Sequence, residues 1–115
     1  MRFAIAFVVL AACSRGGGDG APACPSIGAR FFQIARDELA ASSVDDATRR
    51  GVADQLPAMR DALAQSCADS AWPADIRSCL ADAADRVAFT ACESRLDPAA
   101  LRALDLAARG QIDEQ

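Results

Sequence analysis

The cysteines limit the fold of this chain more than any other feature of the sequence. Four of them follow a Gly-rich linker: Cys24, Cys67, Cys79 and Cys92. A chain of 115 residues with Phe 5, Trp 1 and Tyr 0 can bury only a thin core, and domains of this size often depend on crosslinks. An even number of cysteines in such a chain predicts two disulfides or one metal site, and the redox compartment decides between them.

The first twelve residues indicate which compartment that is. Met1 and Arg2 are followed by a run of uncharged apolar residues from Phe3 to Ala12. A membrane-spanning helix needs about 20 apolar residues, so this run is too short to remain as a transmembrane anchor. A positive start, a short apolar run and small residues before a polar stretch are typical of a secretory signal peptide. We therefore expect residues 1–12 to direct export and to be removed.

The end of this leader resembles the lipobox of bacterial lipoproteins. The resemblance lies in Leu10, Ala11, Ala12 and Cys13. It implies cleavage before Cys13, a diacylglyceryl group on the Cys13 thiol, and two or three acyl chains, such as palmitate, that hold the protein to a membrane. It also implies an outer-membrane protein of the cell envelope that faces the periplasm, because Ser14 rather than Asp follows the cysteine.

A Gly-rich linker separates Cys13 from the body of the protein. Residues 13–23 contain no large apolar side chain, and a flexible chain of about nine residues reaches roughly 15–18 Å. After the linker we expect a helical domain over residues 24–110 and a short C-terminal tail over residues 111–115.

Apolar residues at helical spacing predict two long helices. Ile27, Phe31 and Ile34 indicate a first helix over residues 26–41. Ser43, with an acidic residue three positions later, is the expected cap of the second helix. The expected apolar face of that second helix consists of Val52, Leu56, Met59, Leu63 and Cys67.

Proline and further cap signals complete the prediction of an all-α fold. Pro57 should kink the second helix or divide it near Leu56, because proline lacks a donor and clashes one turn back. Pro73 suits the first position of a third helix, with Asp75 in its first turn. The expected apolar stripe of the third helix is Ile76, Cys79 or Leu80, Ala83 and Val87.

Two more short helices are expected near the C-terminus. Asp85 or Thr90 should begin a fourth helix, and Asp97 followed by Pro98 is a strong start signal for a fifth, which Gly110 should end. No segment alternates with period two over a useful length. We therefore predict an all-α, disulfide-stapled bundle of four to five short helices after a signal peptide and a flexible tether.

In an exported chain the four cysteines should form two disulfides. A zinc site usually has closely paired cysteines, and thioredoxin-like chemistry uses Cys-x-x-Cys, and the sequence contains neither spacing. Facing positions on antiparallel helices favour Cys24–Cys67 with Cys79–Cys92, which would close loops worth about 4 and about 3 kcal/mol. The pairing of Cys67–Cys79 with Cys24–Cys92 stays open. We expect no metal and no cofactor.

The spacing around the tryptophan resembles that of a group of small uncharacterised lipoproteins from GC-rich Gram-negative bacteria. The similar pattern is Cys67-x4-Trp72-x6-Cys79-x12-Cys92 with Cys24 upstream. The resemblance covers about residues 24–104. It implies a helical lipoprotein body and brings no activity with it.

Missing side chains exclude several kinds of chemistry. The chain has His 0 and contains no lysine, so imidazole bases, Ser-His-Asp triads, Schiff bases and P-loop lysines are absent. Its formal net charge of -4 disfavours nucleic-acid binding, which normally needs a clustered basic face. We predict that the protein is not an enzyme and binds no nucleic acid.

The acidic residues are expected to be surface or capping groups. Asp45 and Asp46 lie at a predicted helix start, where carboxylates interact favourably with the helix dipole. Asp82 and Asp85 lie three residues apart, with Arg86 or Arg77 as expected partners. Glu93 is a further candidate. A catalytic carboxylate pair would need a cleft and shifted pKa values, and no pattern in the sequence indicates one.

The densest basic cluster and the tryptophan are the remaining candidates. Arg49, Arg50 and Arg60 are surrounded in sequence by aspartates, so a neutralised surface is expected. Trp72 lies in a turn between two cysteines, where a large ring most often packs over a disulfide or caps helix ends. Alternatively, a partly exposed Trp72 ring would contact a partner or ligand.

The sequence therefore predicts a lipid-anchored protein of the cell envelope, with the membrane as one partner through Cys13. The expected role is a non-catalytic binding or scaffolding module for an envelope protein. The alternative is a carrier of a small ligand or lipid, with a pocket between amphipathic helices near Trp72. An apolar concavity would favour the carrier, and a closed core with a flat apolar patch would favour a protein partner.

Overall fold

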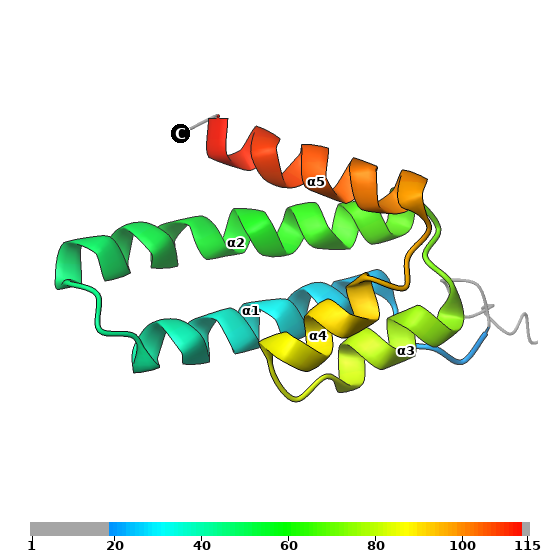
Figure 1. Ribbon diagram of the computed structural model, residues 1–115, viewed down its shortest axis with the longest axis horizontal. Coiled ribbons are helices and arrows are strands. Elements are labelled where there is room, and N and C mark those ends of the chain that lie inside the picture. Colours follow the sequence, from blue (N-terminus) through cyan, green and yellow to red (C-terminus); the bar gives the residue numbers. More distant parts are fainter. Residues whose placement is uncertain (1–18, 114–115) are drawn as a thin grey trace, which may run out of the picture.

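The computed structural model describes residues 19–113, and this part of the chain contains five helices and no strand. The helices are α1 (Cys24–Ala41), α2 (Asp46–Asp69), α3 (Ala74–Asp82), α4 (Arg86–Glu93) and α5 (Pro98–Asp113). The antiparallel pair α1 and α2 forms the centre of the molecule; α3 and α4 form a short hairpin against α1, and α5 packs against α2 (Figure 1). The predicted all-α, disulfide-stapled bundle is confirmed, while the predicted leader and Cys13 lie outside the described residues.

The core is built from one apolar stripe of each helix. Ile27 of α1, Leu80 of α3 and Phe89 of α4 have no exposed surface. The rings of Phe31 and Phe89 pack with their centroids 6.2 Å apart, which joins α1 to the hairpin. Aromatic rings at this spacing attract one another beyond the gain from burial alone. The few aromatic side chains are therefore concentrated where three helices meet.

Gly28 sets the distance between the two central helices. A Cβ atom at this position would lie 2.8 Å from the carbonyl oxygen of Arg60 on α2. The absence of a side chain at Gly28 therefore lets the backbones approach closely, which is the usual structural reason for glycine inside a helix. The guanidinium of the same Arg60 lies over the ring of Phe32 of α1, 5.2 Å from its centroid, which adds a second contact between the two helices.

Both disulfides join helices that run antiparallel. Cys24 at the start of α1 bonds to Cys67 near the end of α2, with Cα atoms 5.6 Å apart. Cys79 of α3 bonds to Cys92 of α4, with Cα atoms 5.8 Å apart. These separations are usual for disulfides. The pairing that the sequence favoured is confirmed, and the rival pairing is wrong.

The other end of the central pair depends on polar groups instead of a crosslink. The side chain of Asp45 accepts a hydrogen bond of 2.7 Å from the backbone N–H of Thr48, so Asp45 caps α2. The prediction of Ser43 as the cap is wrong, because α2 begins two residues later than expected. The guanidinium of Arg49 donates to the carbonyl oxygens of Leu39, Ser42 and Val44 and thereby fixes the turn between α1 and α2.

Pro57 does not divide the second helix. α2 is continuous from Asp46 to Asp69 with Pro57 inside it, and the exposed Pro57 ring lies on the side away from the core. Leu56, the neighbouring residue, is buried against α1. Packing on α1 along both halves of α2 therefore outweighs the lost backbone hydrogen bond, and the predicted division is wrong.

The third helix is shorter than the apolar spacing predicted. α3 ends at Asp82, and Ala83 is extended with its carbonyl oxygen accepting a 2.6 Å hydrogen bond from Arg30 Nε of α1. Val87 therefore belongs to α4, where it is 79% exposed, and its assignment to the stripe of the third helix is wrong. Asp85 caps α4 by accepting from the N–H of Ala88, which confirms one of the two expected starts.

The last helix begins as predicted and ends later. Asp97 accepts a 2.8 Å hydrogen bond from the N–H of Ala100, and Pro98 is the first residue of α5. Gly110 does not end the helix, which continues to Asp113. The helical part of the chain therefore extends into the segment that was expected to be a tail.

The end of the linker is tied to the body of the protein. Arg77 of α3 donates to the carbonyl oxygens of Trp72 and Pro22 and forms an ion pair with Asp19. The Arg77 side chain is only 11% exposed. The expected flexible tether is therefore held against the bundle from Asp19 onward, at the end that carries the Cys24–Cys67 disulfide.

Candidate functional site

An apolar hollow of about 160 Å³ lies between α2 and α5. The lining from these two helices is Met59, Ala62, Leu63, Leu104, Ala107 and Ala108. Small alanine side chains on facing helices leave this space, because α5 packs on α2 without large residues to fill the seam. Phe31 of α1 and Glu93, the last residue of α4, complete the lining.

The arrangement of the helices explains why this hollow is open. α4 packs on α1 and α5 packs on α2, so these two helices cover different central helices (Figure 1). The hollow lies where Phe31 of α1 and Leu63 of α2 meet residues of α4 and α5. The volume is close to that of an engineered cavity of about 150 Å³ that binds benzene. The hollow can therefore receive one side chain or a small apolar group.

A second hollow of about 400 Å³ shares two lining residues with the first, Phe31 and Met59. It extends along α1 and α2 toward the turn between them, where Val44 and Val52 are 39% and 38% exposed. We call the two hollows together the α1–α2 groove. Val52 was predicted to be a core residue, and the structure places it instead on the rim of this groove.

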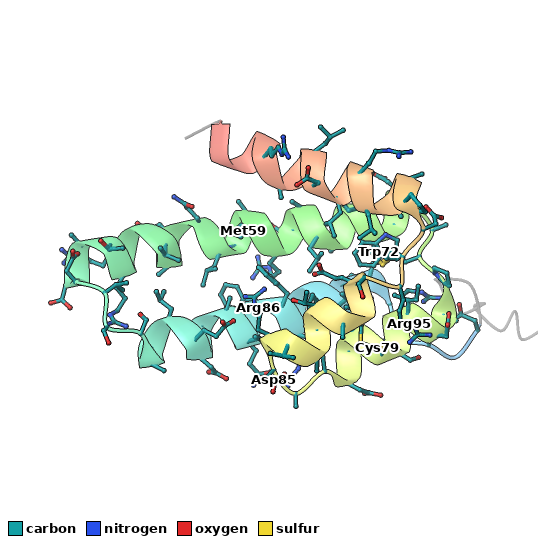
Figure 2. All side chains as sticks on the ribbon, in the orientation of Figure 1. Met59, Trp72, Cys79, Asp85, Arg86 and Arg95 are labelled. Carbon is teal, nitrogen blue, oxygen red and sulfur yellow. A yellow bond between two sulfur atoms is a disulfide. The ribbon has the colours of Figure 1, made fainter. Side chains whose placement is uncertain are left out.

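Arg86 lies at the edge of the α1–α2 groove, across from Met59 (Figure 2). Its Nε donates to Glu38 Oε1 at 2.9 Å, and its guanidinium lies over the ring of Phe31 at 5.1 Å. Arg86 is thus engaged on two sides by α1. The expectation that it pairs with Asp82 or Asp85 is wrong.

Glu93 is the carboxylate that lines the smaller hollow. Burial raises the pKa of the Glu93 carboxyl above its ordinary value, and the positive charge of Arg86 only partly offsets this. Among the described side chains, no ion pair or hydrogen bond to the Glu93 carboxylate is present. A partly desolvated carboxylate of this kind would gain from a cation placed in the hollow.

Trp72 is buried rather than available to a partner. The residue is 3% exposed and lies in the turn between α2 and α3 (Figure 2). It lines a broad surface hollow of about 620 Å³ together with Cys24 and Cys67, so its predicted position beside a disulfide is confirmed. The partial exposure of the ring expected in the alternative is wrong. Trp72 Nε1 has no hydrogen-bond partner among the described residues.

The other acidic candidates have structural positions. Asp45 caps α2, and the N–H of Thr48 holds the pKa of the Asp45 carboxyl below its usual value. Asp85 caps α4, while Asp46 and Asp82 are exposed. These carboxylates do not meet in a cleft. Glu93 alone among the acidic candidates faces an apolar hollow.

The three arginines of the predicted basic cluster do not act as one surface. Arg49 binds backbone carbonyls at the end of α1, and Arg50 is exposed. Arg60 pairs with Asp61 at 3.0 Å and covers Phe32. Neutralisation by aspartate was expected for the whole cluster, and the structure shows it for Arg60.

No cluster of three or more Cys, Asp or Glu side chains within residues 19–113 has the arrangement of a metal site. The described helices include none that combines the length and the apolarity needed to cross a membrane. Cys13, the predicted lipidation site, lies outside the described residues.

Sequence reasoning named Glu93 but missed the groove beside it. The alanines of α2 and α5 that line the hollow were the sequence signal for it. That signal could not be used, because the position of α5 against α2 is a property of the tertiary structure. Comparisons with known proteins add no relative: no family model, no curated protein and no solved structure matches this chain.

Proposed function

We propose that this protein is a lipoprotein of the cell envelope whose helical body is a non-catalytic binding module for another envelope protein. The observation that supports the binding role is the α1–α2 groove, an apolar surface left open between α4 and α5. The leader and the lipobox-like residues that end at Cys13 support the anchor. The acidic charge and the lack of histidine and lysine support a role without catalysis and without nucleic acid.

The dimensions of the groove favour a protein partner over a carried lipid. Pockets that enclose small molecules usually measure about 300–1,000 Å³ and surround most of the ligand. The better enclosed hollow measures about 160 Å³. The hollow of about 400 Å³ and the hollow of about 620 Å³ beside Trp72 have the volume of such pockets, but both are open troughs on the outside of the bundle. An apolar segment of a partner can lie along such a trough and insert one side chain into the smaller hollow.

Site-specific photo-crosslinking in cells tests the binding role. A benzophenone amino acid at Val52 would lie on the rim of the groove, and the same residue at Val87 would lie on an exposed part of α4 outside it. We expect a discrete protein adduct from position 52 and none from position 87. Equal labelling from both positions, or no adduct from position 52, would contradict a binding groove.

The anchor needs a separate test. Mass spectrometry of the mature N-terminus should find an acylated Cys13, and Cys13→Ser should release the protein from the membrane fraction. An intact N-terminus with an unmodified Cys13 would refute the anchor and leave the groove to be judged by the crosslinking result.

A further inference from the structure

Glu93 is the feature that distinguishes the smaller hollow from an ordinary packing defect. The lining of the hollow includes the apolar side chains of Phe31, Met59, Leu63 and Leu104, and Glu93 is the one charged residue in it. A pocket of this composition suits a side chain with an aliphatic stem and a cationic tip, because the stem packs on the apolar walls and the tip meets the carboxylate.

From this geometry we infer that the smaller hollow receives a lysine side chain of the partner protein, with the lysine ammonium bound by the Glu93 carboxylate. The inference rests on the proposed function and names the chemistry that the groove selects. The volume of about 160 Å³ is suited to one side chain and not to a larger ligand.

No described cationic side chain of the protein itself binds the Glu93 carboxylate. Arg86 is the charged group that acts on Glu93, and its guanidinium is bound to Glu38 and stacked on Phe31. The parts of α1, α2 and α5 that line the hollow contribute no charged residue. Burial also raises the pKa of Glu93, so a bound ammonium would relieve an unfavourable state of the free protein.

The first experiment measures the preference of the hollow directly. The probes are lysine and norleucine, each acetylated at the amine and methylamidated at the carboxyl, added to the full chain at constant ionic strength and pH 7. The NMR signal of the Met59 methyl group reports occupancy, because Met59 lines the hollow. We expect capped lysine to bind about fivefold more tightly than capped norleucine, as a partly desolvated ion pair should.

Matched variants show whether the preference comes from Glu93. Glu93→Gln should abolish the preference for lysine, while Asp61→Asn, at a carboxylate that is 71% exposed on α2, should leave it unchanged. Ala107→Leu should fill the hollow and block both probes, whereas Ala103→Leu on the exposed side of the same helix should not. Preference for norleucine, or a lysine preference that survives Glu93→Gln, would overturn the inference.

A second experiment uses the absence of lysine from this chain. Carbodiimide couples a carboxylate to an amine with loss of water, so an amide at Glu93 requires an amine from outside the side chains of this protein. Reduction of the Cys79–Cys92 disulfide followed by tryptic cleavage at Arg86 and Arg95 isolates residues 87–95, in which Glu93 is the sole side-chain carboxylate. The wild-type chain in intact envelopes should yield this peptide joined to a partner lysine.

The two experiments separate failure of the inference from failure of the proposed function. An adduct from Val52 without any amide at Glu93, together with norleucine preferred over lysine, would refute the lysine and leave the groove standing. If neither probe occupied the hollow and no Val52 adduct formed, the lysine inference and the proposed binding function would both be refuted. If Glu93 were coupled to a free amine instead of a partner peptide, the inference that a protein supplies the cation would be overturned.

Discussion

The two disulfides should contribute unequally to stability, and their loop lengths allow the difference to be worked out. The perturbations are the paired substitutions Cys24→Ala with Cys67→Ala, and Cys79→Ala with Cys92→Ala. Each pair removes one crosslink and two sulfur atoms and leaves no free thiol at that site. The two disulfides have similar Cα separations of 5.6 and 5.8 Å, which makes the comparison a matched one.

The expected magnitudes follow from the freedom that each crosslink removes from the unfolded chain. The Cys24–Cys67 disulfide spans 43 residues and the Cys79–Cys92 disulfide spans 13. On the chain-entropy model these loops correspond to about 4 and about 3 kcal/mol. Small domains have total stabilities of about 5–15 kcal/mol, so loss of the longer loop should remove a large part of the total.

Urea unfolding at equilibrium measures the effect, with two probes on the same samples. Circular dichroism follows all five helices, while fluorescence of Trp72 follows the end of the bundle beside Cys24 and Cys67. We expect coincident transitions for the wild-type protein. In the Cys24/Cys67 variant the fluorescence transition should precede the loss of helix, because that end is no longer clamped.

The reasoning would be refuted if the Cys79/Cys92 variant lost as much stability as the Cys24/Cys67 variant or more. Buried sulfur is lost in both variants, since Cys67 is 0% and Cys92 is 5% exposed, so a cavity cannot explain a reversed order. Wild-type protein treated with a reductant should be less stable than either variant, which controls for effects of the alanines.

Three further substitutions test single contacts. Gly28→Ala should destabilise the fold by about 1–3 kcal/mol in urea unfolding, because the new Cβ would meet the Arg60 carbonyl at 2.8 Å; an unchanged midpoint would contradict the close approach of α1 and α2. Ala71→Gly should stabilise the protein by about 0.5–1 kcal/mol, since Ala71 has a φ of 47° at the end of α2, and a loss of stability on thermal unfolding would argue against that conformation. Glu93→Gln should raise stability near neutral pH. Because the pKa of Glu93 is raised in the folded state, protonation of Glu93 stabilises the wild-type fold. This stabilisation is fully present below the ordinary pKa of 4.5 and is lost as pH rises through the folded pKa. The advantage of Gln should therefore vanish in acid when the free energy of unfolding is measured against pH.

Local signals predicted much of the fold. Asp97 and Pro98 begin α5 as expected, because a side-chain cap and a fixed proline φ act within a few residues. The favoured disulfide pairing was also correct, since two antiparallel helices bring residues at equal distances from a turn together. These predictions needed no knowledge of how α5 is placed.

The errors occur where distant residues decide the outcome. Pro57 was expected to kink or divide α2, and the division did not occur, because α1 packs along both halves of that continuous helix. Val87 has the spacing of an α3 residue, yet Arg30 of α1 binds the Ala83 carbonyl where the chain turns, and Val87 becomes exposed. The α1–α2 groove was missed for the same reason, since it exists only because α4 and α5 cover different central helices.

The attachment of the linker decides how the proposed lipid and the proposed groove are related in space. Arg77 binds Asp19 and Pro22, so the linker leaves the bundle at the end that carries the Cys24–Cys67 disulfide. A Gly-rich segment as long as the one from Cys13 to Asp19 reaches roughly 12–15 Å, so the proposed acylation of Cys13 would keep that end of the bundle near the headgroups. Along α1, Phe31 lies about 10 Å beyond Cys24 and the far end of the groove about 27 Å beyond it, at a rise of about 1.5 Å per residue. A partner held in the groove would therefore contact the protein about 10–27 Å from the end that bears the proposed anchor, and the crosslinked end would remain free of the partner.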